Sequence, residues 1–521
     1  MTATVNPVSQ NQIFRGHVGK IWRESSVFFA GSLFTTAAGY FFRIFLARSL
    51  GAEALGIYTL GMTIVGFLGI LAALGLPQAA VRFVAAYIAT GHLRALREFL
   101  KRSLFYLLFT NLILGIAIVI CGRWIAASIY HTPSLAPYLF LFCAIMLLGS
   151  LNAFLGQTLA GFKDVSRRTV ITNFIGTPLN MVLSVALITA GLGLCGYVIA
   201  QVGSAFAVLA LLALTVWRIL CAQAAGVQID VIPLPGDVLS FSAATLSMEL
   251  LGFLLSQGDK VMIGLLRNAR ELGVYAVAGA LVAFVPVVLQ AINQIFAPTI
   301  SDLHASEQTL VLRRLFQRLA KWTFACTFPG ACVLIVFSRE FMSIFGTDFK
   351  SGWPILVIGT LGQLINCAVG SVGFMLLMSG NERKLLRVQI AMAALTMIAN
   401  CFLIPRLGIS GAAVGAALAN TLTNLWCLHE VRKHLGFLPF TRSYAKLLVP
   451  CVATTSALFL IHRFVFTSEF LIAALAGSVA LAYLIFGTIA LLTATDDDDR
   501  ILTSAVSNRV KTFFRMQPQE G

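Results

Sequence analysis

The segment ARSLGAEALGIY at residues 47–58 decides the fold, because a related segment, ARELGVY, recurs at 269–275. A second landmark, the dipeptide Leu-Gly, occurs at 192–193 and again at 407–408. The first landmark ends at Tyr58, and Leu192 follows 134 residues later. The second copy ends at Tyr275, and Leu407 follows 132 residues later. This spacing predicts an internal duplication, which is common among membrane transporters.

The composition excludes a soluble chain of 521 residues, since 58% of residues are hydrophobic, 11% are charged and the mean hydropathy is +0.89. A run of about 20 apolar residues crosses a hydrocarbon core of about 30 Å as a helix. Barrel strands would instead show alternating segments of about ten residues, which are missing. The predicted fold class is an all-α polytopic membrane protein with about 14 transmembrane helices. The runs cover 26–48, 56–86, 102–121, 137–161, 168–190, 194–220, 238–266, 273–299, 319–337, 353–378, 385–405, 409–429, 444–466 and 469–494.

The formal net charge of +16 could indicate nucleic-acid binding, but the distribution of the charges favours another explanation. Most of the 37 lysines and arginines fall in segments that would lie on the same side of the membrane as the N-terminus. This bias is the positive-inside rule, which predicts that both termini are cytoplasmic. We therefore expect no nucleic-acid partner and a multi-pass membrane location.

Six runs precede a polar linker, and the six that follow it form the second half of the repeat, with the last two runs outside it. An even number of spans returns the chain to the same side. The two halves should therefore be parallel repeats related by an axis along the membrane normal. The expected architecture is two six-helix bundles around a central cavity, with two additional helices beside the second bundle. The predicted parts are an N-terminal cytoplasmic segment at 1–25, the first bundle at 26–221, a cytoplasmic linker at 222–237, the second bundle at 238–430, two additional transmembrane helices at 444–494 and a cytoplasmic tail at 495–521.

Arg43 and Lys260 are the leading site candidates, because the shift of 217 that aligns the landmark tyrosines also places Lys260 on Arg43. Each ends a stripe of small and polar residues on one face of its helix. Such a stripe fits a helix that lines a water-filled cavity, and close helix packing is the alternative. The stripes consist of Ser25, Ser32, Thr36, Gly39 and Arg43 in the first run, and of Ser242, Thr245, Glu249, Ser256 and Lys260 in the seventh.

Two further ionisable residues lie within predicted spans, where each is costly unless it faces protein or water. Glu249 is a carboxylate near the middle of a span, and it could take up a proton, bind sugar hydroxyls or form a salt bridge that only holds the bundle together. Arg82 lies in the second span and could meet an anionic phosphate or extend to the membrane surface. The predicted substrate-binding residues are Arg43, Lys260, Glu249, Arg82, Ser256 and Thr36.

Sequence motifs for catalysis or cofactor binding are missing. The chain has no Gly-x-x-x-x-Gly-Lys-Ser/Thr phosphate loop, no His-Glu-x-x-His metal helix and no Gly-x-Ser-x-Gly nucleophile turn. The seven histidines are scattered, and no Cys-x-x-Cys pair occurs among the ten cysteines. We therefore expect a protein that is not an enzyme and that has no catalytic residue, metal site or cofactor.

Three blocks of the sequence resemble the polysaccharide transporter family, which includes bacterial flippases of O-antigen, capsule and exopolysaccharide repeat units. The first block is FRIFLARSLGAEALGIYTLGMTIVGFLGILAALGLPQAAVRFVA at 42–85, and the second is ELGVYAVAGALVAFVPVVLQAINQIFAPTISDL at 271–303. The third comprises GNERKLLRVQ at 380–389 and LIPRLGISGAAVGAAL at 403–418. These blocks span most of the chain and identify the superfamily far better than the substrate.

The resemblance implies the fold of the multidrug/oligosaccharidyl-lipid/polysaccharide exporter superfamily, with two bundles that form a V-shaped cavity. It implies translocation of an undecaprenyl-diphosphate-linked oligosaccharide across the bacterial cytoplasmic (inner) membrane by alternating access. It also implies that cavity cations meet the diphosphate, with Arg43 as the best candidate and Lys260 as a weaker one, because lysine lacks bidentate geometry.

The expected partners are the lipid-linked oligosaccharide and membrane lipids, together with a polysaccharide polymerase and glycosyltransferases. Two other functions stay open on the sequence alone. One is ion-coupled multidrug extrusion on the same fold, although one carboxylate against two cations favours an anionic substrate. The other is a scaffold for a glycan-synthesis complex that transports nothing, although such a scaffold has no need for paired polar stripes.

Overall fold

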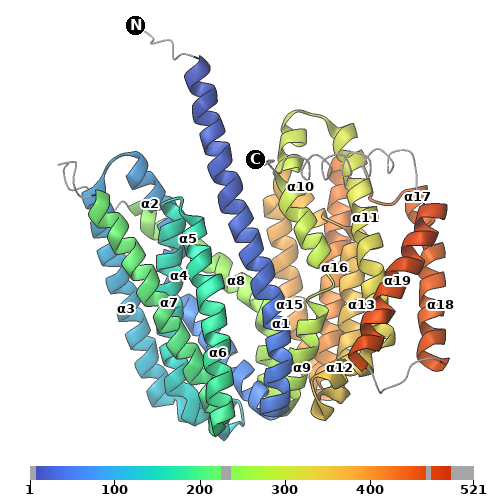
Figure 1. Cartoon of the computed structure of the whole chain (residues 1–521), viewed down its shortest axis with the longest axis horizontal. Helices are drawn as coiled ribbons and strands as arrows, with labels where there is room; N and C mark the ends of the chain where they lie inside the picture. Colours follow the sequence, from blue (N-terminus) through green and yellow to red (C-terminus); the bar gives the residue numbers. More distant parts are fainter. Residues whose placement is uncertain (1–6, 224–235, 465–470, 495–521) are drawn as a thin grey trace, which may run out of the picture. The chain divides into compact units, whose positions relative to one another are not determined.

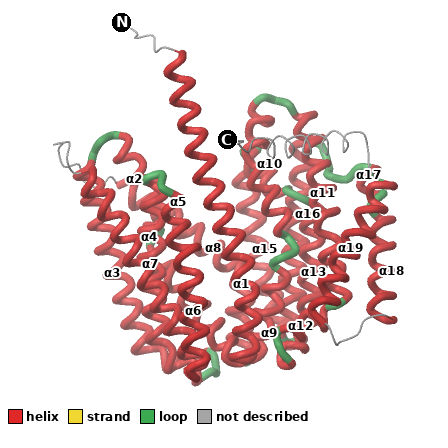
Figure 2. The backbone as a smooth tube through the Cα atoms, in the orientation of Figure 1, coloured by secondary structure: helices red, strands yellow, loops and turns green. Residues whose placement is uncertain are grey.

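The computed structural model describes residues 7–223, 236–464 and 471–494, and every regular element in these ranges is helical (Figures 1 and 2). Nine helical segments in the described ranges are long and apolar enough to cross a membrane, or ten if one bent pair counts as a span. Two of the nine, Phe34–Ala89 and Val165–Cys221, contain 56 and 57 residues. A straight helix of that many residues would extend about 85 Å, enough for two crossings, and both segments contain breaks, at Gly51 and Leu74–Gly75 in the first and at Gly191–Gly193 in the second. The prediction of an all-α, multi-pass membrane protein is confirmed.

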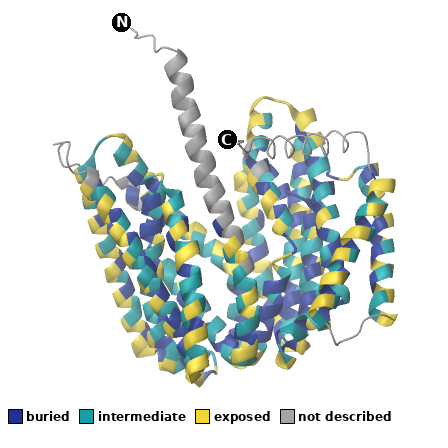
Figure 3. Ribbon diagram, in the orientation of Figure 1, coloured by how far each residue is buried: buried dark blue, intermediate teal, exposed yellow. Residues whose placement is uncertain are grey.

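Contacts divide the chain into two compact units, Met1–Gly273 and Val274–Gly521. In the first unit the fully buried side chains of Leu96, Phe99, Phe154 and Leu159 form a core between α2, α3 and α4. The opposite side of α3 exposes large apolar side chains, as a lipid-facing helix does (Figure 3). The helices of this unit are α1 (Pro7–Ala73), α2 (Leu76–Ala89), α3 (Leu93–Trp124), η1 (Ile125–Ile129), η2 (Pro133–Tyr138), α4 (Leu139–Gly161), α5 (Val165–Thr169), η3 (Val170–Gly176), α6 (Thr177–Leu187), η4 (Ile188–Leu192), α7 (Gly193–Gln223) and α8 (Gly236–Leu266).

The second unit is built around a core of Phe296, Ile300, Phe316 and Met375, all of which are buried. Its helices are α10 (Val287–Ala305), α11 (Thr309–Val336), α12 (Ser338–Ile344), η5 (Thr347–Gly352), α13 (Trp353–Val369), α14 (Val372–Met378), α15 (Glu382–Leu407), α16 (Ile409–Leu435), α17 (Arg442–Ala445), α18 (Leu448–Phe464) and α19 (Leu471–Thr493). Helix α9 (Ala269–Val282) begins in the first unit and ends in the second.

Helices α18 and α19 are the two additional spans expected after the repeat, and both pack on α11 of the second unit. Val333 and Phe337, at the end of α11, are fully buried against Leu458 of α18 and Ala482 of α19. The Tyr483 hydroxyl donates a hydrogen bond of 2.9 Å to the backbone carbonyl of Cys326 on α11. Apolar packing and this bond fix the last pair of helices to the unit.

The Leu-Gly landmarks have the same backbone geometry in both repeats, which supports the duplication. Gly193 has φ 50° and ψ −130°, and Gly408 has φ 62° and ψ −146°. This region of φ/ψ space is open almost only to glycine. In each repeat the glycine ends one helix and starts the next, since α7 begins at Gly193 and Gly408 caps both α15 and α16. The sequence keeps glycine at these two sites because the break requires it.

The two copies of the first landmark contact each other. A Cβ added at Gly56 would lie 1.6 Å from the backbone oxygen of Ala269, and a Cβ added at Gly273 would lie 1.9 Å from that of Ala52. The shift of 217 converts Gly56 to Gly273 and Ala52 to Ala269, so these contacts are one contact made twice. The repeats therefore meet here in a self-complementary way, as surfaces do around a two-fold axis.

Helix α8, the first helix of the second repeat in sequence, packs against α1 and α2. Its Thr245 hydroxyl donates to the backbone carbonyl of Gly75 at 3.3 Å, and the ring of Phe253 lies 5.7 Å from that of Phe67. Contacts therefore place α8 in the first compact unit, although the sequence repeat begins at about residue 238. This packing brings residues of both repeats into one unit.

Candidate functional site

Arg43 on α1 and Lys260 on α8, the two repeat-equivalent cations, lie close enough for their charges to repel. Arg43 is exposed, with its guanidinium 5.8 Å from the ring of Tyr40 one turn earlier. Lys260 is half-buried, and its Nζ donates a hydrogen bond of 2.7 Å to the side-chain oxygen of Gln257. Within the described residues neither cation forms a salt bridge, although Asp259 lies beside Lys260. The two cations and the carboxylate of Asp259 form a charged group in the first unit, with one more positive than negative charge.

A polar cluster lies beside this pair, within electrostatic range of Arg43. Gln201 of α7 donates from Nε2 to the hydroxyl of Tyr58 at 2.6 Å and to that of Tyr197 at 3.1 Å. The two tyrosine rings are 4.8 Å apart, and Tyr197 is buried. The cluster ties α1 to α7 next to Arg43. The sequence prediction missed it, because a tyrosine is ordinary in an apolar run and Gln201 lies 143 residues from Tyr58.

Glu249 of α8 is half-buried and has Gln78 of α2 as its hydrogen-bond partner. It forms no salt bridge with any described residue, so the structure does not contain the internal ion pair considered from the sequence. Eleven residues separate Glu249 from Lys260, which is about 16 Å along a helix. Glu249 is therefore a polar centre separate from the Arg43–Lys260 pair.

Arg82 lies on α2, one turn after Gln78, and its side chain is exposed. Its guanidinium lies 4.8 Å from the ring centre of Phe241 and 5.6 Å from that of Phe83. Both distances are within the range of cation–π attraction. Arg82 thus packs against the start of α8 rather than beside Arg43.

The remaining two predicted residues, Thr36 and Ser256, are both exposed. Ser256 precedes Lys260 by one turn, and its hydroxyl donates to the backbone carbonyl of Phe253 at 3.4 Å. Thr36 precedes Arg43 by about two turns on α1. Of the predicted set, the structure brings Arg43 and Lys260 together, while Glu249 and Arg82 lie along the α2–α8 contact.

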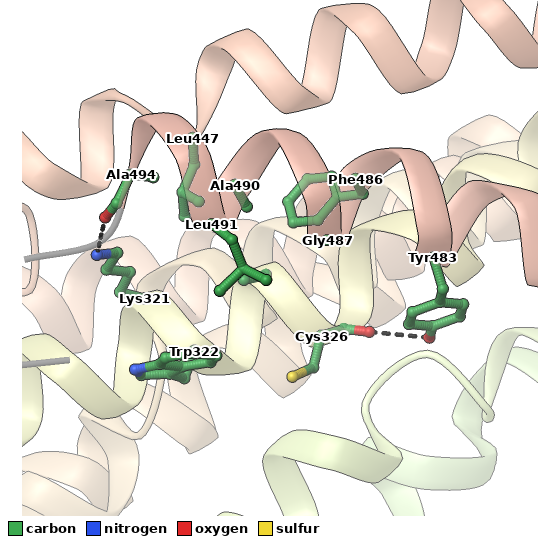
Figure 4. A pocket seen from close by; sticks show the side chains of 11 residues that line it. Lys321, Trp322, Cys326, Leu447, Tyr483, Phe486, Gly487, Ala490, Leu491 and Ala494 are labelled. Carbon is green, nitrogen blue, oxygen red and sulfur yellow. Dashed lines mark hydrogen bonds between the residues drawn. The ribbon is translucent and has the colours of Figure 1, made fainter. Parts of the chain in front are cut away.

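The second unit has an apolar pocket of about 250 Å³ between α11 and α19 (Figure 4). Lys321 lies at one end, 4% exposed, where its Nζ donates to the Ser443 hydroxyl and, at 2.6 Å, to the backbone oxygen of Ala494. Trp322, Phe486 and Leu491 supply apolar lining. Because the ammonium group is already hydrogen-bonded, this pocket is a structural feature around a buried lysine.

In the described ranges, no three side chains of histidine, cysteine, aspartate or glutamate are grouped so that they could hold a metal ion. The cysteines of these ranges are unpaired. The polar chemistry of the first unit therefore rests on Arg43, Lys260 and the hydrogen-bonded groups around them.

Two proteins of the archaeon Haloferax volcanii are similar in sequence. One is described as the probable low-salt glycan biosynthesis flippase Agl15, 22% identical over 408 residues, which cover 78% of this chain and 82% of that protein. The other is the probable flippase AglR, 23% identical over 209 residues, or 40% of this chain. That second match spans 44% of AglR, less than half of its length.

Two solved structures with a similar fold are a lipid II flippase and a multidrug resistance transporter. A structure of the lipid II flippase MurJ in an inward closed conformation superposes with a TM-score of 0.66 over 89% of this chain and 98% of that one, at 14% identity. An inward-facing multidrug resistance MATE transporter of the MOP superfamily superposes with a TM-score of 0.58 over 76% of this chain and 94% of that one, at 16% identity. These superpositions confirm the predicted fold.

The sequence also matches a protein-family description over residues 21–304, which is more than half of the chain and contains both copies of the first landmark. The matched range includes Arg43, Lys260 and the helices that hold them. The chain belongs to the polysaccharide biosynthesis protein family.

Proposed function

We propose that this protein is a flippase for an oligosaccharide linked to a polyprenyl diphosphate in the cytoplasmic membrane of a bacterium. In this proposal the glycan is destined for a surface polysaccharide such as O-antigen, capsule or exopolysaccharide, and both termini are cytoplasmic. The family and the two related flippases support transport of a lipid-linked glycan. The observation that carries the proposal is the proximity of Arg43 and Lys260.

Two cations held near each other are unfavourable in a membrane, and the carboxylate of Asp259 beside Lys260 offers one negative charge against two positive ones. A diphosphate supplies further negative charge and accepts several charge-assisted hydrogen bonds. Arg43 can hold two phosphate oxygens with its planar guanidinium, whereas Lys260 acts as a point charge. The pair therefore suits the diphosphate group, which is the part of the substrate that is hardest to move through hydrocarbon.

The proposed mechanism is alternating access. The sugar-diphosphate headgroup crosses in a water-filled cavity while its polyprenyl tail stays in lipid, so the hydrocarbon core of about 30 Å is never crossed by an unsolvated charge. The cations offset the cost of removing water from the diphosphate. Polysaccharide polymerase and glycosyltransferases are the proposed partners on either side of this step.

The test is flipping in proteoliposomes. The purified protein is reconstituted with a fluorescent polyprenyl-diphosphate oligosaccharide, and access of a membrane-impermeant quencher to the label is followed over time. We expect the label to exchange between leaflets faster than in protein-free liposomes. Exchange at the protein-free rate, with correctly folded protein present, would contradict the proposal.

Multidrug extrusion is the second candidate, because Glu249 is a half-buried carboxylate in α8 that no described cation neutralises. An organic cation could bind such a group. The same proteoliposomes loaded with a cationic dye distinguish the functions: the proposed flippase leaves dye retention unchanged under a proton or sodium gradient. Dye efflux that is lost in Glu249→Gln would favour extrusion.

A further inference from the structure

The second unit contains a cavity of about 320 Å³ lined by neutral polar side chains. This volume is at the lower end of the range of about 300–1,000 Å³ that is usual for ligand pockets. The lining comes from α10, α13, α14 and α16, and it contains no ionisable residue. Its polar members are five carboxamides and one hydroxyl: Gln290, Asn293, Gln363, Asn366, Asn424 and Ser371.

The carboxamides follow a pattern along the chain. Gln290 and Asn293 are three residues apart on α10, and Gln363 and Asn366 are three residues apart on α13. Residues with this spacing share one face of a helix. Two helices therefore each present a Gln-x-x-Asn pair to the same cavity.

Asn293 is 9% exposed, and its side-chain oxygen has no hydrogen-bond partner among the described residues. Buried polar atoms are nearly always paired, so an unpaired one calls for an explanation. Two bonds of the other amides stay within one helix: Asn366 donates to Gln363 at 3.1 Å, and Asn424 donates to the backbone oxygen of Asn420 at 2.9 Å. None of these bonds links one lining helix to another, so the amides do not hold the helices together as polar groups in membrane bundles often do.

Two helix breaks border the same cavity. Helices α9 and α10 meet at a bend of 53°, and Pro286 caps α10 at that bend. Helices α13 and α14 are separated at Gly370, which has φ 78° and ψ −151°. Within a membrane, irregular backbone is tolerated where it is buried in protein or lines a wet cavity, and broken helices form the binding sites of many transporters.

The first repeat does not carry these amides. The shift of 217 places Gln290 on Ala73 and Asn293 on Leu76, both of which belong to the apolar core of the first unit. The repeat fold can therefore be built with apolar side chains at these positions. Only the second unit has amides at these positions. This difference indicates that the amides serve to bind a ligand and are not needed for the fold.

We propose that this cavity is the subsite for the neutral sugar rings of the transported glycan, an inference that rests on the proposed function. A carboxamide has both donors and acceptors, as a sugar hydroxyl does, so the two can pair in either direction. The absence of charge from the lining suits an uncharged, hydroxyl-rich ring and not a phosphate. Asn293 gains its missing partner when a hydroxyl donates to its oxygen.

The test compares two probes on the full-length protein in lipid nanodiscs: a polyprenyl-diphosphate-linked oligosaccharide and the same polyprenyl diphosphate without sugar. The wild type is expected to bind the sugar-bearing lipid more tightly. Asn293→Leu and Gln363→Leu are expected to weaken that binding about tenfold, the effect of losing one or two hydrogen bonds, and to leave binding of the sugar-free lipid unchanged. If the buried substitutions reduce folding, Gln290→Leu replaces them, because Gln290 is an exposed residue of the lining. This variant is also expected to weaken binding of the sugar-bearing lipid alone.

Asn111→Leu is the matched control, because Asn111 is also buried with an unpaired side-chain oxygen but lies on α3 and lines no part of this cavity. It is expected to leave both affinities unchanged. Equal losses for both lipids in the cavity variants would overturn the subsite. Failure of the wild type to bind either lipid would instead reject the proposed function.

Discussion

Gly56 and Gly273 occupy equivalent positions in the two repeats, and each packs on the backbone oxygen of the alanine that lies one helical turn before the other. The reciprocal contact explains why the first landmark is retained in both repeats: its glycines allow two helix backbones to touch. Arg43 and Lys260 each precede this contact by 13 residues, so the packing that joins the repeats also brings the two cations together.

Gly56→Ala and Gly273→Ala are both expected to destabilise the protein by about 1–3 kcal/mol, because the added methyl group would overlap a carbonyl oxygen. Thermal unfolding of the purified variants in detergent measures the effect. Gly279→Ala is the control, since a Cβ there meets nothing within 4 Å. Equal unfolding temperatures for all three variants would show that the close contact is not formed.

Gln201→Leu is expected to lower stability by about 1–3 kcal/mol, because it leaves the hydroxyls of Tyr58 and Tyr197 without their shared donor. Tyr58→Phe removes one of those hydroxyls, so the double variant should be less unstable than the sum of the two single ones. A double-mutant cycle on unfolding temperature tests this coupling. Additive effects would mean that the hydrogen bond does not contribute.

Lys321→Met is expected to lower the unfolding temperature, because it removes the hydrogen bonds that join α11 to Ser443 and to the end of α19. A methionine fills a similar volume, so the loss reports the hydrogen bonds more than the packing. Ser443→Ala removes one of these bonds and should have the smaller effect. An unfolding temperature for Lys321→Met at or above that of the wild type would contradict this structural role.

Hydropathy predicted the helical class, and the shift of 217 aligned Arg43 with Lys260, because both are local or periodic signals. The sequence did not predict the Tyr58–Gln201–Tyr197 cluster or the amide cavity, since each depends on which faces of distant helices meet. A partial signal for the cavity was present: Gln-x-x-Asn occurs at 290–293 and again at 363–366. Neutral amides are ordinary in single helices, so only the structure shows that they converge.

Lys260→Arg and Lys260→Gln separate the contribution of charge from that of geometry. Arginine keeps the charge and presents its N–H donors in a planar, bidentate arrangement, so Lys260→Arg should flip the lipid-linked glycan at or near the wild-type rate. Lys260→Gln should lose part of the activity, but less than removal of the Arg43 charge does. Proteoliposome flipping rates, with protein amounts matched by folded fraction, provide the comparison. A larger loss in Lys260→Gln than in Arg43→Gln would reverse the assigned roles.

The flipping rate of Arg43→Gln is the most direct test of the account, because Arg43 is the proposed principal contact of the diphosphate. Loss of a charge-assisted contact of about 1.5–3 kcal/mol predicts a rate about 10- to 100-fold below that of the wild type, with an unchanged unfolding temperature. Arg218→Gln removes one exposed positive charge from α7 of the same unit and should keep the wild-type rate. A wild-type flipping rate in Arg43→Gln would contradict the claim that paired cations bind the diphosphate.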